Sequence, residues 1–220
     1  MGLQAVFAGI HPDWYARADA AAHGEAAHAA HDAFDDELLQ RARDSALGRR
    51  LLARWLMREA DCGELFAPRP DGAIAAVVLR WPRERLDALA RDVGVLACAP
   101  AIRAEVQREP VRQLRRALGN SYLLALDKQV WNGRLGPQFS EPLFPALAAA
   151  LADPRGDVAL HALFDRHGRA ELQAWAARHD PALAQWLVLQ HPREPRPATH
   201  LPEAQVRFLH DHHLARARAA

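Results

Sequence analysis

Two clusters of histidines are the residues of this sequence that could bind a metal ion. The clusters are His23, His28 and His31, and His210, His212 and His213. Two histidines one helical turn apart can share a metal because they project from the same helix face. His23 and His28, however, miss the HExxH spacing by one residue, which is about 100° of helix rotation. His28 and His31 have suitable spacing but no evident third ligand, so we expect solvated helix histidines, no metal and no cofactor.

The enzyme class closest to this pattern is the HD-type metal-dependent phosphohydrolase, whose fold is also all-helical. His31 and Asp32 would form its central pair, with His11 or His23 before them. Those spacings do not match well, and no later aspartate stands out. A helical phosphohydrolase is therefore kept as the alternative to a protein without catalytic activity.

Other catalytic motifs are incomplete. A phosphate-binding loop needs Gly-Lys-Ser/Thr, but Lys128 is followed by Gln129. The stretch 119–123 (GNSYL) resembles half a nucleophile elbow and lacks its second glycine. We identify no catalytic residue and expect a non-catalytic binding protein.

Four arginines are the candidate partner-binding residues. They share one face of a predicted helix at positions i, i+4, i+7 and i+8, and are Arg108, Arg112, Arg115 and Arg116. The face is either a solvated helix surface or a docking site for an acidic protein. A nucleic-acid role would favour interleaved aromatic residues, and none lie between Trp81 and Tyr122. We expect no nucleic-acid partner, and rank the arginine face ahead of the acidic run at residues 35–37.

Charge is nearly balanced over the whole chain but unevenly distributed. The 220 residues contain 28 Lys and Arg against 27 Asp and Glu, for a net charge of +1. Residues 1–46 carry eight acidic groups against three arginines, so the remainder is positive. This polarity favours docking to charged proteins.

Cysteine content and hydropathy suggest a location. Cys62 and Cys98 form no CxxC motif and fit two buried, reduced thiols, although a disulfide between them stays open. No leader peptide is evident, and the longest apolar runs, such as 73–79, are far too short to span a bilayer. We expect a cytoplasmic protein without direct membrane insertion.

Apolar periodicity predicts a mainly α fold. Helices are expected in the Ala- and His-rich stretch before residue 36, over about 36–59, between 82 and 130, and over about 145–152, 158–179, 181–190 and 203–217. Residues 73–79 could be a short strand or a buried helical turn. Residues 133–145 are expected to be a Gly- and Pro-rich connection.

The expected core lies in the segment from Trp81 to Trp131, and its members are Leu86, Leu89, Val93, Ile102, Val106, Leu114, Leu118 and Leu126. A second apolar stripe is expected from Leu47, Leu51, Trp55 and Leu56 or Met57. We predict a single compact helical domain over 1–190, an extended Pro-rich linker over 191–202, and a C-terminal helix over 203–220.

The central segment resembles the SctK family of bacterial type III secretion, whose members include YscK and PscK. The resembling features are Leu86–Leu89 with Gly94, then AIRAEV (101–106), then VRQLRRALG (111–119). The early HPDW (11–14) is similar to the HP-x-W motif near the N-terminus of that family. Residues after about 133 contribute no motif.

The resemblance implies a function in protein transport. SctK proteins are cytosolic accessory components of the sorting platform beneath the injectisome, a virulence apparatus. They link the cytoplasmic domain of the inner-membrane ring protein SctD to the SctQ pods, and through these indirectly to SctL and the ATPase SctN. The resemblance therefore implies a cofactor-free adaptor that is peripheral to the inner membrane through the secretion apparatus.

Overall fold

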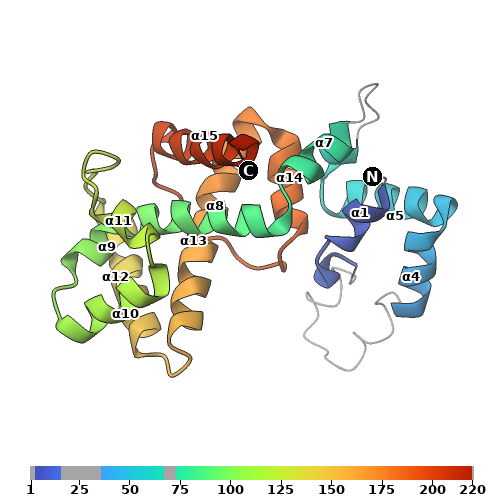
Figure 1. Cartoon of the computed structure of the whole chain (residues 1–220). Helices are drawn as coiled ribbons and strands as arrows, with labels where there is room; N and C mark the ends of the chain where they lie inside the picture. Colours follow the sequence, from blue (N-terminus) through green and yellow to red (C-terminus); the bar gives the residue numbers. More distant parts are fainter. Residues whose placement is uncertain (1–2, 16–35, 67–72, 220) are drawn as a thin grey trace. The chain divides into compact units, whose positions relative to one another are not determined.

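All regular structure is helical in the computed structural model of the chain, which describes residues 3–15, 36–66 and 73–219 (Figure 1). No strand occurs within those ranges, so the mainly α prediction is confirmed. Residues 73–79, where the sequence left strand and helix open, lie in a helix. The helix predicted in the Ala- and His-rich stretch falls on residues 16–35, outside the described ranges.

The elements in chain order are α1 (Leu3–Ala8), the 3₁₀ helix η1 (Pro12–Trp14), α4 (Asp36–Asp44), α5 (Ala46–Glu59), α6 (Gly63–Phe66), α7 (Ala73–Arg80), α8 (Arg83–Ala97), α9 (Ala99–Ala104), α10 (Arg108–Leu118), α11 (Ser121–Leu126), α12 (Pro137–Ala152), α13 (Asp157–His179), α14 (Pro181–Leu189) and α15 (Glu203–Ala219). None of these described helices combines the length and the apolar character needed to cross a membrane.

The chain groups into two compact units. The first comprises residues 1–83 and 176–195, and the second comprises 84–175 and 196–220. The range 1–190, predicted from the sequence as one domain, is thus shared between the two units. Residues 191–202 contain no helix or strand, as expected for a Pro-rich linker, and α15 follows them. The domain limits 1–190, 191–202 and 203–220 stay a prediction.

Helix α14 packs against α6 and α7 in the first unit. It begins at Pro181, and the side chain of Asp180 caps it by accepting from the backbone N–H of Leu183 at 3.1 Å. The buried indole N–H of Trp186 donates to the carbonyl of Trp81 at 3.0 Å. The one side-chain donor of this buried tryptophan is thus hydrogen-bonded, and the bond fixes the orientation of the indole ring within the apolar core.

The HPDW segment (residues 11–14) forms hydrogen bonds with the C-terminal end of α14. The backbone N–H of His11 donates to the carbonyl of Leu189 at 2.7 Å. The indole N–H of Trp14 is shared between the carbonyls of Val188 (3.1 Å) and His191 (2.8 Å). The carbonyl of Leu189, the last residue of α14, has no partner within the helix, so the N–H of His11 satisfies a group that would otherwise need water. The motif therefore has a structural role within the first unit.

Two glycines let α8 and α13 cross closely in the second unit. A Cβ added at Gly94 would lie 1.8 Å from the carbonyl oxygen of Phe164, and one at Gly168 would lie 1.6 Å from that of Ala90. Contacts under about 3 Å are excluded by sterics, so any side chain here would push the helix backbones apart. Beside the crossing, Arg91 binds Asp165 through two hydrogen bonds of 2.9 Å each.

Six of the eight predicted core residues are buried, and Val106 and Leu126 are not. Leu86, Leu89, Val93, Ile102, Leu114 and Leu118 are at most 6 % exposed, whereas Val106 is 85 % and Leu126 is 40 % exposed. Val106 lies in the break between α9 and α10, where helical periodicity no longer applies. Leu126 is the last residue of α11, which buries Tyr122 and Ala125 instead.

The stripe predicted along residues 47–57 is wrong for Leu47 and Leu51, although Leu56 is buried and Trp55 stacks on Tyr15. Leu47 and Leu51 are 67 % and 55 % exposed, while Leu52 and Leu56 are buried. The apolar residues of α5 occupy two faces, and only tertiary packing selects the buried one. The single helix predicted over 36–59 is likewise interrupted at Ser45, whose hydroxyl caps α5 by accepting from the N–H of Gly48 at 2.8 Å.

The connection predicted over 133–145 is largely helical, because α12 already begins at Pro137. Pro142 and Pro145 lie inside this helix at exposed positions. Each removes one hydrogen bond on the outer side, where water can replace it. The buried Leu143 and Leu147 hold the helix in place despite that loss.

Candidate partner-binding surface

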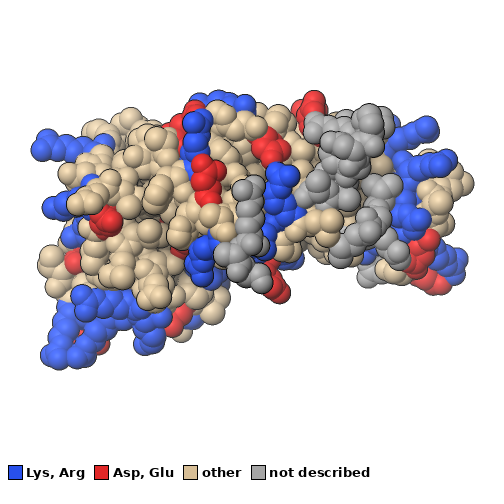
Figure 2. Space-filling model, turned by 45° about the horizontal axis from the view of Figure 1, so that its top comes forward, with Lys and Arg blue, Asp and Glu red and all other residues tan. Residues whose placement is uncertain are grey.

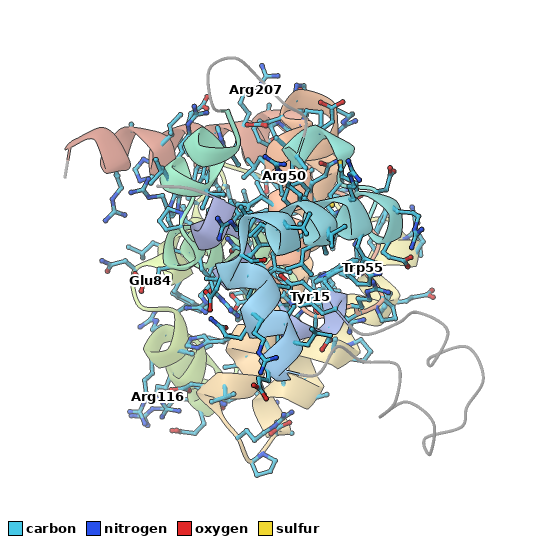
Figure 3. The ribbon with its side chains drawn as sticks, turned by 90° about the vertical axis from the view of Figure 1, so that its right-hand side faces the viewer. Tyr15, Arg50, Trp55, Glu84, Arg116 and Arg207 are labelled. Atoms are coloured by element: carbon cyan, nitrogen blue, oxygen red, sulfur yellow. The ribbon has the colours of Figure 1, made fainter. Side chains whose placement is uncertain are left out.

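The four candidate arginines share the outer face of α10, which we call the α10 arginine face. Arg108, Arg112, Arg115 and Arg116 are all exposed, and Leu114 and Leu118 are buried on the opposite side. Figure 2 shows Lys and Arg side chains gathered at its lower left, over the part of the second unit where Figure 1 places α10. Arg116 projects away from the ribbon (Figure 3). The predicted face is therefore present as a surface.

The ends of α10 follow from its sequence. Pro110 is the third residue of the helix, where the missing N–H has no intrahelical acceptor to lose. Gly119 follows the last residue with a φ of 52°, and its N–H donates to the carbonyl of Arg115 at 2.9 Å. The positive φ is accessible to glycine without strain, so the helix stops there.

Helix α10 is held against α13 by two polar contacts. Nε2 of His161 lies 2.8 Å from the carbonyl of Ala117, so this nitrogen must carry the proton. Arg116 binds both carboxylate oxygens of Asp157 at 3.0 and 2.8 Å. This pairing lowers the pKa of Asp157, chiefly through the hydrogen bond from the guanidinium.

The four guanidiniums therefore differ in their freedom to bind a partner. Arg112 pairs with Glu109 at 2.9 Å, and Arg115 lies over the ring of Tyr122 at 5.5 Å from its centre. Arg108 forms no ion pair with any residue that the structure describes. Exposed pairs such as Arg112–Glu109 contribute little and are easily exchanged for a partner carboxylate. Arg108 and Arg112 are the members best placed for docking.

A buried carboxylate in the second unit is a polar site that the sequence did not indicate to us. Oε1 of Glu171, on α13, accepts from the backbone N–H groups of His200 (2.7 Å) and Leu201 (3.1 Å). The side chains of Glu171 and His200 are only 4 % and 5 % exposed. Burial raises the pKa of Glu171 to about 7. The sequence feature that could have indicated this site is a glutamate, one turn after Gly168, at a position of α13 that the helical period places on the buried face.

The imidazole of His200 completes this buried site. Its Nε2 lies 3.0 Å from the carbonyl of Ala97 and so donates to it. Its Nδ1 lies 3.3 Å from Oε1 of Glu171. Burial lowers the pKa of His200 and that of nearby His167, the latter to about 4. The contacts fasten residues 200–201, at the end of the Pro-rich segment, to α8 and α13.

A serine, an aspartate and a histidine also meet in the second unit. Asp92 accepts from the hydroxyl of Ser121 at 2.5 Å through one oxygen, and its other oxygen lies 2.9 Å from Nε2 of His213. In a hydrolase triad the histidine contacts the serine and the carboxylate lies behind it. Here the carboxylate is in the middle, so the arrangement joins α8, α11 and α15 without activating the serine.

The other described histidines of the predicted clusters, and His11, make separate contacts. His210 lies against Trp175 with ring centres 4.7 Å apart, and His212 is exposed. Within the described ranges, no group of three or more His, Cys, Asp or Glu side chains is arranged to hold a metal. His11 accepts from the backbone N–H of Asp13 at 3.3 Å. His31 and Asp32, the central pair of the phosphohydrolase alternative, lie outside the described residues, as do His23 and His28.

The two cysteines are free and buried, which resolves the alternative left open by the sequence. Burial raises the pKa of Cys62 to about 12 and also raises that of Cys98. Of the acidic run at 35–37, Asp35 lies outside the described residues, and Glu37 pairs with Arg41 one turn later.

Comparison of the chain with protein-family models gives no match, and comparison with curated proteins and with solved structures gives none either.

Proposed function

We propose that this protein is a cytosolic adaptor of a type III secretion sorting platform. It would link the cytoplasmic domain of SctD to SctQ, and thereby act indirectly on SctL and SctN, and be held near the inner membrane by the apparatus. The observation that carries the proposal is the ordered resemblance of residues 11–14, 86–94, 101–106 and 111–119 to the SctK family.

The positions of the resembling residues support the proposal. Leu86 and Leu89 are buried on α8 and Gly94 lies at the α8–α13 crossing, while Leu114 and Leu118 are buried beneath the arginines of α10. The segments thus form a packed core that presents one charged helix face. The helix backbone of this face is already ordered, so docking costs conformational entropy only for the arginine side chains.

The α10 arginine face offers the chemistry for an acidic partner. Guanidiniums bind carboxylates through forked, charge-assisted hydrogen bonds. Arg108 and Arg112 lie one turn apart, and an acidic substitution at Arg108, the first residue of α10, also suits the helix dipole. The variant R108E/R112E reverses this charge at exposed positions, and the carboxylate that it places beside Glu109 is screened by water because both side chains are exposed. R116E is less suitable, because it would place a carboxylate beside Asp157.

The experiment measures binding of the full chain to purified SctQ and, separately, to the cytoplasmic domain of SctD. R108E/R112E should weaken one of these affinities at least roughly tenfold at low salt and flatten its salt dependence. The matched control is R207E/R216E, which makes the same charge change at exposed positions of α15 in the same unit. Equal affinities for the wild type, the variant and the control would contradict the role of this face.

A further inference from the structure

The first unit presents a second basic helix face, on α5. Its outer positions are Leu47, Arg50, Leu51, Arg54 and Arg58, which we call the α5 outer face. All five side chains are exposed, and they fall within about 100° of the helix circumference. The face contains no acidic residue. Figure 3 looks onto α5, with Arg50 and Trp55 labelled.

The arginines of this face are less engaged than those of α10. Arg50 and Arg54 form no ion pair or hydrogen bond with the described residues. Within the described ranges, the one ion pair of Arg58 is a contact of 3.6 Å with neighbouring Glu59. Arg49, by contrast, points elsewhere and donates to the carbonyls of Arg43 and Asp44, which end α4. One arginine of α5 is thus structural, and three are presented outward.

Two leucines on the same face are exposed without an evident structural reason. Leu47 and Leu51 are 67 % and 55 % exposed and lie one turn apart, while Leu52 and Leu56 already fill the core. Isolated exposed leucines are ordinary. A leucine pair beside three outward arginines has the composition of an interface, with an apolar contact flanked by charge.

We propose that the α5 outer face is a second docking surface, which binds an acidic protein surface that also offers an apolar pocket. The positive face, free of acids, is complementary to such a partner in charge. The leucines lie in the N-terminal half of α5 and two of the arginines in its C-terminal half, along the same line of the helix. On a bilayer, the leucines and the arginines of this face would insert to a similar depth, although leucine favours the acyl chains and arginine the headgroups. A protein surface can instead offer an apolar pocket to the leucines and carboxylates to the arginines.

The inference rests on the proposed function, because an adaptor that joins two proteins needs two separate surfaces. The α5 outer face then holds one partner and the α10 arginine face holds the other. Charge on such faces governs the association rate, and apolar contacts govern dissociation. The two kinds of substitution on α5 should therefore affect different rate constants for the same partner.

The test measures binding rates of the full chain to purified SctQ and to the SctD cytoplasmic domain as separate probes. R50E/R54E should slow association with one probe, weakening that affinity roughly tenfold or more, and leave the other affinity unchanged. L47S/L51S should speed dissociation of the same probe. R108E/R112E should affect the other probe, and R207E/R216E neither. Circular dichroism and thermal unfolding of each variant check that it is folded.

The failures of the two proposals are distinguishable. A wild-type chain that binds neither probe refutes the adaptor function and, with it, this inference. If the wild type binds both probes and R50E/R54E binds them with the same affinities, the inference about α5 is refuted but the adaptor function is not. Two further results would overturn it if these substitutions left probe binding unchanged. One is sedimentation of the wild type with phosphatidylglycerol vesicles that R50E/R54E abolishes. The other is a wild-type dimer that L47S/L51S dissociates.

Discussion

Oε1 of Glu171 lies 3.3 Å from Nδ1 of His200, and both side chains are almost fully buried. Because Nε2 of His200 donates to the carbonyl of Ala97, the neutral ring presents an unprotonated Nδ1 to the carboxyl group. Two acceptors facing each other repel, and Nδ1 of His200 has no hydrogen-bond partner among the described residues, so an ionised Glu171 is unfavourable here. Burial, which raises the pKa of Glu171, and this unpaired acceptor both favour the neutral carboxyl group.

Stability should depend on the protonation of Glu171. Its folded pKa of about 7 lies above its ordinary 4.5, so its stabilising contribution is full below about pH 4.5 and is lost as pH rises to 7. The pKa values of His200 and His167 are lowered, so those rings oppose folding as pH falls below 6.5. Comparing the wild type with E171Q separates the carboxyl contribution from that of the histidines.

We expect the E171Q variant to gain stability relative to the wild type as pH rises from about 4.5 to 7, by at most about 3 kcal/mol, and to level off above that. Urea titrations at pH 4.5, 6 and 8 measure the difference. A difference that stays constant over this range would mean that Glu171 does not change its charge there in the folded protein.

The glycine crossing of α8 and α13 should tolerate no side chain. We expect G94A and G168A each to cost about 3 kcal/mol or more, because the added methyl group meets a backbone carbonyl that cannot rotate away. The control is G63A, since a Cβ at Gly63 has nothing within 4 Å. Denaturant titration of all three variants decides the matter, and a wild-type midpoint for G94A would rule out this crossing.

Burial of Leu114 beneath the arginine face can be tested by truncation. L114A should lower the free energy of unfolding by about 2–5 kcal/mol, because it removes a fully buried side chain. V106A, at a position that is 85 % exposed, should change it by less than about 0.5 kcal/mol. Similar small effects of both substitutions would show that α10 does not pack as described.

Chelation tests the histidine clusters, including those outside the described residues. A metal held by the folded state raises stability by mass action, so removing it lowers the melting temperature. We expect EDTA to leave the melting temperature of untagged protein unchanged. A clear fall, together with copurified metal, would favour the helical phosphohydrolase instead of an adaptor.

Helical class and much of the core could be predicted because they depend on local patterns. Leu86, Leu89 and Val93 recur with helical spacing, and Gly119 marks a helix end that its φ of 52° confirms. The buried face of α5 could not be predicted from the sequence, because leucines occupy both faces of this helix. The helix through Pro142 and Pro145 was missed because tertiary packing outweighed the local preference of proline.

The candidate surface was predictable in position but not in its internal pairing. Spacing alone placed four arginines on one face of a helix. That Arg116 is held by Asp157, 41 residues away in sequence, follows only from the packing of α10 against α13. The Glu171–His200 contact likewise joins distant residues, and no local pattern links them.

The central claim is that this chain joins two proteins of a secretion platform, and complex formation tests it most directly. Purified full chain, SctQ and the SctD cytoplasmic domain are mixed and analysed by size-exclusion chromatography with light scattering. We expect a species that contains all three proteins and that does not form when the chain is omitted. Elution of the chain apart from both proteins, or binding of each partner only by displacement of the other, would contradict the claim.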